Sequence, residues 1–174
     1  TAGSTNTGSV DDLKKIASVS DLSDPIWNQK FKTNGLPSVT SKIWFHVDGA
    51  YGAAFALTEY GQQKLNGLSL SDSISFDLHK SFAAPYGTGA LLVKNATDMK
   101  INYLSQQNYM PPSSMNTFNS AENEADFSAS ARLSAEYGPL DFADITPELS
   151  RDYRGLRVWL PFKTLGIQPF ILNL

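Results

Sequence analysis

Two charged side chains stand where the sequence predicts the ends of strands. Asp48 follows the apolar run 43–47, and Lys80 lies shortly after a second strand-like run, 73–76, further along the chain. The first run is compact and rich in β-branched and aromatic residues, as in a strand buried on both faces of a sheet, and the second predicts another strand. A helical segment between them would return the second strand beside the first, so we expect the carboxylate and the amine to share one crevice.

An acid and an amine placed in this way could hold pyridoxal phosphate. A buried carboxylate beside the pyridine nitrogen keeps that nitrogen protonated, and a partly desolvated lysine forms the resting imine. Asp48 is the candidate acid, although it could instead cap the helix after its strand. Lys80 is the candidate amine because no acid adjoins it in the sequence, although most lysines are solvated surface groups.

Other polar groups leave two interpretations open. For His46 the favoured one is a hydrogen-bonded position at a strand end, whereas His79 could contact phosphate or substrate. The small, hydroxyl-rich segment Gly3–Gly8 precedes a predicted helix, which is typical of a phosphate cradle and also of an ordinary loop. A set of arginines recurs at helical spacing: Arg151, Arg154 and Arg157. Such a set forms either a solvated helix face or a site for phosphate or carboxylate.

Length and composition indicate one globular domain. The 174 residues are 41% hydrophobic, which is enough for a core. The net charge of -3 and the pI of about 5.3 come without a basic run, so we expect no nucleic-acid or membrane partner. There is no cysteine and there are only two histidines, so no metal site is expected. The absence of a starting methionine and the uncovered apolar residues 165–172 predict a piece of a larger protein.

The order of elements predicts an α/β fold with a mostly parallel, mixed sheet covered by helices. The expected strands are 43–47, 73–76 and 89–94, and the short turn before the last of them predicts an antiparallel pair. The expected helices are 9–17, begun by a Ser9 cap, a turn around Trp27, 59–65, and a long helix from Pro147 through Leu160 that Pro161 interrupts or kinks. The polar segment 102–130 is either a functional lid or disordered.

Four segments resemble, in the same order, the group II pyridoxal-phosphate-dependent amino-acid decarboxylases, which include the aromatic-amino-acid, histidine and glutamate enzymes. These segments are 1–5, 46–51, 72–80 and 150–159. The resemblance implies the central part of the large domain of a type I pyridoxal-phosphate enzyme. Residues 1–166 would be a partial cofactor-binding domain with a mobile loop at about 102–130, and 167–174 would begin the connection to a C-terminal domain.

The resemblance also implies roles for individual residues. Lys80 would be the Schiff-base lysine and Asp48 the pyridinium partner. The remaining cofactor contacts would come from Ala50 on one ring face, Thr5 lining the pocket, Asp77 near the phosphate, His79 before the lysine, and Ser150 at the phosphate of the neighbouring subunit. Tyr109 would close over the site with the mobile loop and help to protonate the substrate carbon after loss of carbon dioxide.

The implied activity is decarboxylation of an L-amino acid to an amine and carbon dioxide, in a cytoplasmic homodimer that shares its sites between subunits. Another carbon–carbon lyase, an aminotransferase or a desulfurase on the same fold, and a truncated scaffold without activity, remain alternatives. The sequence departs from many relatives at Leu78, where they have proline. Relatives are also much longer, and the segments with their stacking histidine and main phosphate loop are missing, so we expect the isolated piece to be inactive.

Overall fold

The computed structural model describes residues 1–21, 25–35, 42–95, 98–99, 145–148 and 150–174. They belong to two units, of which the first comprises Thr1–Lys94 and Tyr153–Leu174 and the second Asn95–Asp152. The sheet and its helices lie in the first unit. The predicted loop 102–130, with Tyr109, falls outside the described residues.

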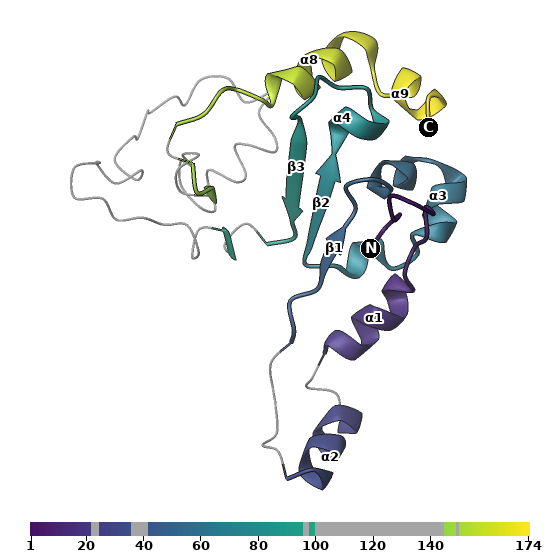
Figure 1. Cartoon of the computed structure of the whole chain (residues 1–174), viewed down its shortest axis with the longest axis vertical. Helices are drawn as coiled ribbons and strands as arrows, with labels where there is room; N and C mark the ends of the chain where they lie inside the picture. The colour runs from purple at the N-terminus through teal and green to yellow at the C-terminus, as the bar shows by residue number, and fades with distance from the viewer. Residues whose placement is uncertain (22–24, 36–41, 96–97, 100–144, 149) are drawn as a thin grey trace, which may run out of the picture. The chain divides into compact units, whose positions relative to one another are not determined.

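Three strands form the sheet, in the order β1 (His46–Asp48), β2 (Ser73–Asp77) and β3 (Gly89–Val93) (Figure 1). β1 pairs with β2 in parallel, and β2 pairs with β3 in antiparallel fashion. The predicted α/β class and mixed sheet are therefore confirmed.

The sequence predicted that the first strand begins at Ile43, but β1 begins at His46. The reason is a side chain that replaces the neighbouring strand: the Phe45 N–H donates to Asp72 Oδ2 at 2.8 Å, and the Asp72 N–H donates to the Phe45 carbonyl at 2.8 Å. Lys42 donates to the other oxygen of the same carboxylate at 2.6 Å. The backbone groups of Phe45 are thus satisfied outside the strand ladder.

Helices complete the first unit, and several differ from the sequence prediction. α1 spans Leu13–Ser20, and its cap is Asp12 rather than Ser9, because Asp12 Oδ1 accepts the Lys15 N–H at 3.0 Å. α2 spans Pro25–Thr33 and is longer than the predicted turn. α3, Glu59–Lys64, is confirmed, with Thr58 as its cap. The short helices were not predicted; they are η1 (Ala53–Leu57), η2 (Leu68–Leu70) and α4 (Leu78–Ser81).

The C-terminal helices α8 (Leu156–Leu165) and α9 (Gln168–Leu172) contradict the predicted start at Pro147. α8 continues through Pro161, although that residue has no N–H to donate to the preceding turn. Three aromatic rings join these helices to α4: Phe162 and Phe170 have centroids 4.7 Å apart, and they lie 5.7 and 6.0 Å from the ring of Phe82. Figure 1 shows both helices beside α4.

Two apolar clusters form the core of this unit. The first consists of Ala2, Leu13, Phe45, Val47 and Leu65, and the second of Ala54, Leu78 and Phe82. β2 contributes to both, because Ile74 packs against the first cluster and Phe76 against the second. Asp77 therefore stands between Phe76, which packs against the second cluster, and Leu78, which belongs to it. None of the helices in the described part of the chain is long and apolar enough to cross a membrane.

Candidate active site

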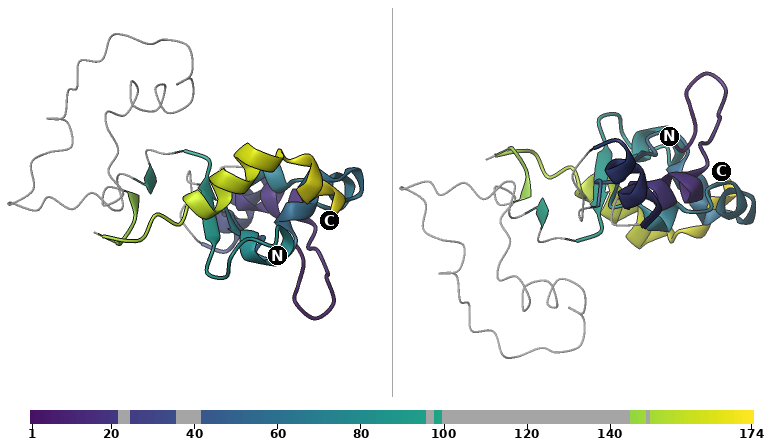
Figure 2. Two further views of the ribbon diagram at one scale, coloured as in Figure 1. Left: turned by 90° about the horizontal axis from the view of Figure 1, so that it is seen from above. Right: turned by 90° about the horizontal axis from the view of Figure 1, so that it is seen from below.

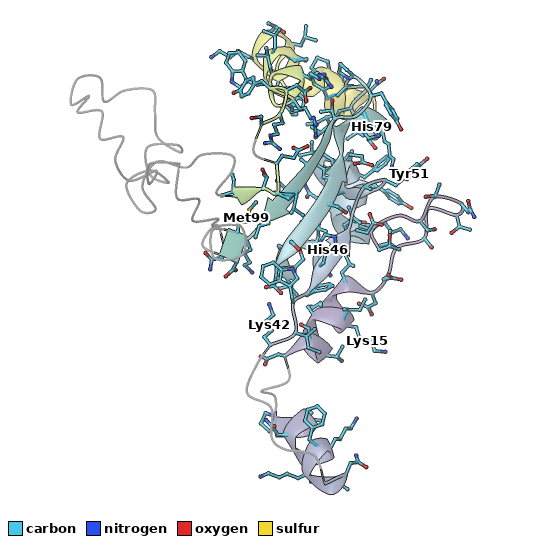
Figure 3. The ribbon with its side chains drawn as sticks, turned by 60° about the vertical axis from the view of Figure 1, so that its left-hand side comes forward. Lys15, Lys42, His46, Tyr51, His79 and Met99 are labelled. Atoms are coloured by element: carbon cyan, nitrogen blue, oxygen red, sulfur yellow. The ribbon has the colours of Figure 1, made fainter. Side chains whose placement is uncertain are left out.

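The candidate site lies at the carboxyl ends of the parallel pair β1 and β2. Asp48 is the last residue of β1, Asp77 is the last residue of β2, and Lys80 follows in α4. Ligands of open α/β sheets bind at this edge. Figure 3 shows His79 and Tyr51 near the end of the sheet where β2 runs into α4, and His46 nearer the opposite end. The predicted meeting of Asp48 and Lys80 is supported, because each charge shifts the pKa of the other group.

Asp48 is held as a carboxylate by the backbone and by the next strand. Its Oδ1 accepts the Ala50 N–H at 3.1 Å and the Ser75 hydroxyl at 3.2 Å. The hydrogen bond from Ala50 lowers the pKa of Asp48 most, burial opposes this, and Ser75 with the charges of Lys80 and His46 lowers the pKa further. The sequence predicted a buried carboxylate, but the Asp48 side chain is exposed. It caps no helix; its bond to Ala50 is a local turn.

Lys80 does not match the predicted partly desolvated amine. Its Nζ lies 2.7 Å from Asp77 Oδ2, and its side chain is 39% exposed. The pKa of Lys80 is raised, first by the hydrogen bond to Asp77 and then by the charges of Asp77 and Asp48, with the last contribution from Tyr51, while burial opposes the rise. The sequence suggested no acidic partner because Asp77 is not adjacent in the chain. One turn of α4 brings the two side chains together.

The two histidines have different surroundings. The His79 Nδ1 lies 3.0 Å from the Thr88 carbonyl, which can only accept, so Nδ1 carries the proton of that hydrogen bond. This leaves His79 Nε2 facing Asp77 Oδ2 at 4.0 Å. His46 Nδ1 lies 2.7 Å from the Ser73 hydroxyl, in the hydrogen-bonded position at a strand end that was predicted for it.

The N-terminal segment is tied to the backbone of Asp48. The Ala2 N–H and the Thr1 hydroxyl both donate to the Asp48 carbonyl, at 2.8 and 3.2 Å. A Cβ on Gly52 would lie 2.1 Å from the Ala2 carbonyl oxygen, so only glycine allows this close approach. The start of the chain is therefore part of the scaffold around the site.

The segment Gly3–Gly8 does not form the predicted cradle at a helix N-terminus. α1 begins only at Leu13, and the hydroxyls of the segment bond within it, with Ser4 Oγ 2.7 Å from Thr7 Oγ1 and 2.8 Å from Ser9 Oγ. This purple loop extends away from the sheet in Figure 2. Thr5 lies in it and is exposed. The ordinary loop is the interpretation that the structure supports.

The predicted arginine face does not form, because α8 begins at Leu156. Of the three arginines only Arg157 is helical, and Arg154 belongs to the turn before α8. Arg151 lies in the second unit, where its Nη1 is 3.6 Å from Glu148 Oε2. Ser150 also belongs to the second unit, and Tyr109 lies outside the described residues.

Sequence reasoning missed three contributors to the site. The contact of Ser75 with Asp48 follows from the β1–β2 register, which places the two residues opposite each other. Tyr51 follows the Asp48 turn, and it is one of the groups that raise the pKa of Lys80. Gly89 pairs with Asp77 across β2 and β3, and a Cβ there would lie 3.0 Å from Asp77 Oδ1. The first and third signals depend on strand pairing, whereas Tyr51 could have been noticed from its place beside Ala50.

The comparisons identify the family. Residues 1–172 match the sequence model of the pyridoxal-dependent decarboxylase conserved domain, and the chain belongs to this family. The predicted membership and the predicted cofactor, pyridoxal 5′-phosphate, are thereby confirmed at the level of the family.

Named proteins and a solved structure are similar to this chain over nearly its whole length. The chain is 30% identical to the aromatic-L-amino-acid decarboxylase of Bacillus atrophaeus, over 97% of this chain and 28% of that protein. It is 27% identical to the 3,4-dihydroxyphenylacetaldehyde synthase of Drosophila melanogaster, over 97% of this chain and 26% of that protein. The crystal structure of mouse CSAD matches with a TM-score of 0.62 and 25% identity, over 98% of this chain and 28% of that one. The chain thus spans little more than a quarter of these relatives.

The donor set fits the cofactor of this family. Ala50 and Ser75 occupy Oδ1 of Asp48, whereas Oδ2 accepts no hydrogen bond from any residue that the structure describes. A carboxylate oxygen without a hydrogen-bond donor can accept a hydrogen bond from a protonated ring nitrogen. Lys80 offers an accessible primary amine near it. Asp48 and Lys80 can therefore hold the two ends of the cofactor's reactive system, its ring nitrogen and its aldehyde carbon.

Proposed function

We propose that this chain provides the lysine and the acid of a pyridoxal-phosphate-dependent decarboxylase, which removes the α-carboxylate of an L-amino acid as carbon dioxide and leaves the amine. One observation carries the proposal: Asp48 is the last residue of β1 and Lys80 lies in the helix that follows its parallel neighbour β2, so both stand at the same edge of the sheet. The family match supports the same assignment.

The cofactor, when bound, supplies an electron sink for the bond that breaks. Asp48, ionised and held by Ala50 and Ser75, would keep the ring nitrogen protonated. Lys80 would bind the cofactor covalently and exchange it with the amine of the substrate. We assign further contacts as predicted from the resemblance: Ala50 at a ring face, Thr5 at the pocket wall, Asp77 near the phosphate, and Ser150 at the phosphate of the neighbouring subunit. His79, which precedes the lysine, would contact the phosphate or the substrate.

The remaining parts of the proposal concern the whole protein. We propose a cytoplasmic homodimer in which Tyr109, on a mobile loop at about 102–130, protonates the substrate carbon. Residues 1–166 would belong to the large domain, and 167–174 would lead into the next one. We also propose that residues 1–174 alone do not catalyse the reaction, because the stacking histidine and the main phosphate loop that the resemblance implies are not among them.

The test uses the full-length protein loaded with pyridoxal phosphate. Borohydride reduction followed by peptide mass spectrometry is expected to find the cofactor on Lys80, and Lys80→Ala is expected to lose both the attachment and carbon dioxide release. Lys15→Ala, which changes an exposed lysine of α1, is the matched control. Attachment elsewhere, or unchanged attachment in Lys80→Ala, would refute the proposal.

A panel of amino acids separates the alternatives. Equal yields of carbon dioxide and amine support the decarboxylase. An aldehyde product would favour a reaction of the kind named for the Drosophila melanogaster relative. Release of sulfide, or transfer of the amino group without carbon dioxide, would favour a desulfurase or an aminotransferase, and no reaction in the loaded dimer would favour the scaffold.

A further inference from the structure

The carboxylate of Asp77 does not serve the helix that it precedes. Asp77 is the N-cap residue of α4, but its side chain accepts no hydrogen bond from the backbone of that helix. Asp77 Oδ2 instead lies 2.7 Å from Lys80 Nζ and 4.0 Å from His79 Nε2. An N-cap aspartate normally satisfies a free N–H of the first turn, so this side chain has an orientation that favours the lysine.

The antiparallel strand leaves room for this orientation. Gly89 pairs with Asp77, and a Cβ at Gly89 would lie 3.0 Å from Asp77 Oδ1. Carbon and oxygen atoms that are not bonded normally stay farther apart than this. Any larger residue at position 89 would therefore push against the carboxylate that holds Lys80.

The carboxylates of Asp77 and Asp48 favour the ammonium form of Lys80. Asp77, Asp48 and Tyr51 raise the pKa of Lys80, and the hydrogen bond from Lys80 to Asp77 is the largest cause. His79 is the other titratable group that faces Asp77, and its protonation would compete for the same oxygen. A lysine nitrogen must lose its extra proton before it can act as a nucleophile, so the ion pair opposes the covalent attachment of a cofactor.

We propose that Asp77 is a positioning residue that holds Lys80 as an ammonium group at the end of β2 until the cofactor is attached, and that Gly89 preserves the space for this contact. The inference rests on the proposed function, since it concerns the lysine assigned to attachment. Attachment then requires opening of the ion pair and loss of one proton from Lys80 to water, which reaches its side chain. The lysine nitrogen would then bond to the aldehyde carbon of the cofactor, whose oxygen would leave as water. Attachment should accordingly become faster as the pH rises.

The test measures the lysine and not the activity. Cofactor-free, full-length protein is briefly acetylated with acetic anhydride across a pH series, and mass spectrometry quantifies each lysine. At a fixed pH below the labelling midpoint, Asp77→Asn is expected to increase acetylation of Lys80 by about twofold to fivefold, the range that an exposed ion pair allows. Lys42, which pairs with Asp72 at 2.6 Å, is the control within the same sample and should not change.

Two further variants keep the result interpretable. Asp77→Glu, which retains the charge, should restore labelling of Lys80 toward the wild-type level. Gly89→Ala should increase it as Asp77→Asn does, and it serves as the second test if Asp77→Asn does not fold. Unchanged labelling of Lys80 in a folded Asp77→Asn or Gly89→Ala protein would overturn the inference.

The proposed function fails by a different measurement. If borohydride finds the cofactor on Lys80 of the wild-type protein while Asp77→Asn leaves labelling unchanged, the inference is wrong and the proposed function stands. If the wild-type protein carries no cofactor on Lys80, the proposed function is wrong, and with it the role given to Asp77 in attachment, whatever the labelling shows about the ion pair.

Discussion

Replacing Ser75 by alanine should loosen the hold on the Asp48 carboxylate. The hydroxyl of Ser75 donates to Asp48 Oδ1 at 3.2 Å, and the Ala50 N–H donates to the same oxygen at 3.1 Å. Ser75→Ala removes one of the two hydrogen bonds and leaves the other. Because both hydrogen bonds lower the pKa of Asp48, the variant should have a higher pKa at this carboxyl.

The size of the effect follows from the exposure of Asp48. A hydrogen bond to a charged group contributes about 1.5–3 kcal/mol where solvent is excluded. The Asp48 side chain is exposed, so water replaces much of the lost bond, and about 0.5–1 kcal/mol remains. That free energy corresponds to about twofold to fivefold weaker binding of pyridoxal phosphate by the full-length protein.

The pH dependence has a definite sign. The pKa of Asp48 in the folded protein is lowered, so its carboxylate is charged at neutral pH. This negative charge is lost as the pH falls through the pKa. Ser75→Ala raises the pKa and should therefore lose the cofactor at a higher pH during acidification. Equilibrium titration with pyridoxal phosphate, followed by absorbance at each pH, measures both effects.

Two controls decide the outcome. Ser18→Ala removes a hydroxyl from the exposed surface of α1, where it donates to the Lys15 carbonyl at 2.7 Å, and it should bind as the wild type does. Ser75→Thr keeps a hydroxyl and should retain most of the affinity. If Ser75→Ala and the wild type give superimposable titrations at every pH, Ser75 does not support Asp48.

Two further predictions concern stability. Gly52→Ala would place a Cβ 2.1 Å from the Ala2 carbonyl oxygen, so it should lower the free energy of unfolding by about 2–4 kcal/mol. Gly155→Ala is the control, because a Cβ there meets open space and should change the free energy of unfolding by less than about 0.5 kcal/mol. Equal thermal midpoints for the two variants would contradict this prediction. Burial raises the pKa of Asp72, but hydrogen bonds from Lys42 and from the Phe45 N–H lower that pKa overall. The ionised carboxylate therefore stabilises the fold at pH values above the pKa of Asp72 in the unfolded chain, and this stabilisation is lost as the pH falls through the pKa in the folded protein. Asp72→Asn should therefore cost about 1–2 kcal/mol in urea unfolding at pH 7 and less near pH 3, and a constant difference would refute the assignment.

The strands could be predicted because their signals are local. The run before Asp48 is apolar, β-branched and aromatic, residues 73–76 alternate serine with Ile74 and Phe76, and a short Gly- and Pro-containing turn leads from α4 into β3. A short connection between two strands favours an antiparallel pair, which is the observed arrangement. The meeting of Asp48 and Lys80 followed from the same reasoning, because parallel strands bring their carboxyl ends to one edge.

The electrostatic state of the site could not be predicted in the same way. α4 has only four residues, Leu78–Ser81, and so short a helix leaves no periodic pattern in the sequence. Without that helix, nothing indicated that Asp77 would lie beside Lys80. The start of β1 was missed for a related reason, because the Asp72 side chain takes the place of a strand neighbour at Phe45.

Leu78 shows why a departure from the family pattern can leave the site intact. It occupies the first position of α4, where proline is well tolerated because the N–H at this position needs no partner within the helix. In this chain the leucine side chain is 6% exposed and packs in the cluster with Ala54 and Phe82. The His79 N–H donates to the Thr88 carbonyl at 3.2 Å, which fixes α4 against the turn before β3. Because that contact involves the next residue and not Leu78, an exchange of leucine and proline changes the packing while Lys80 keeps its place.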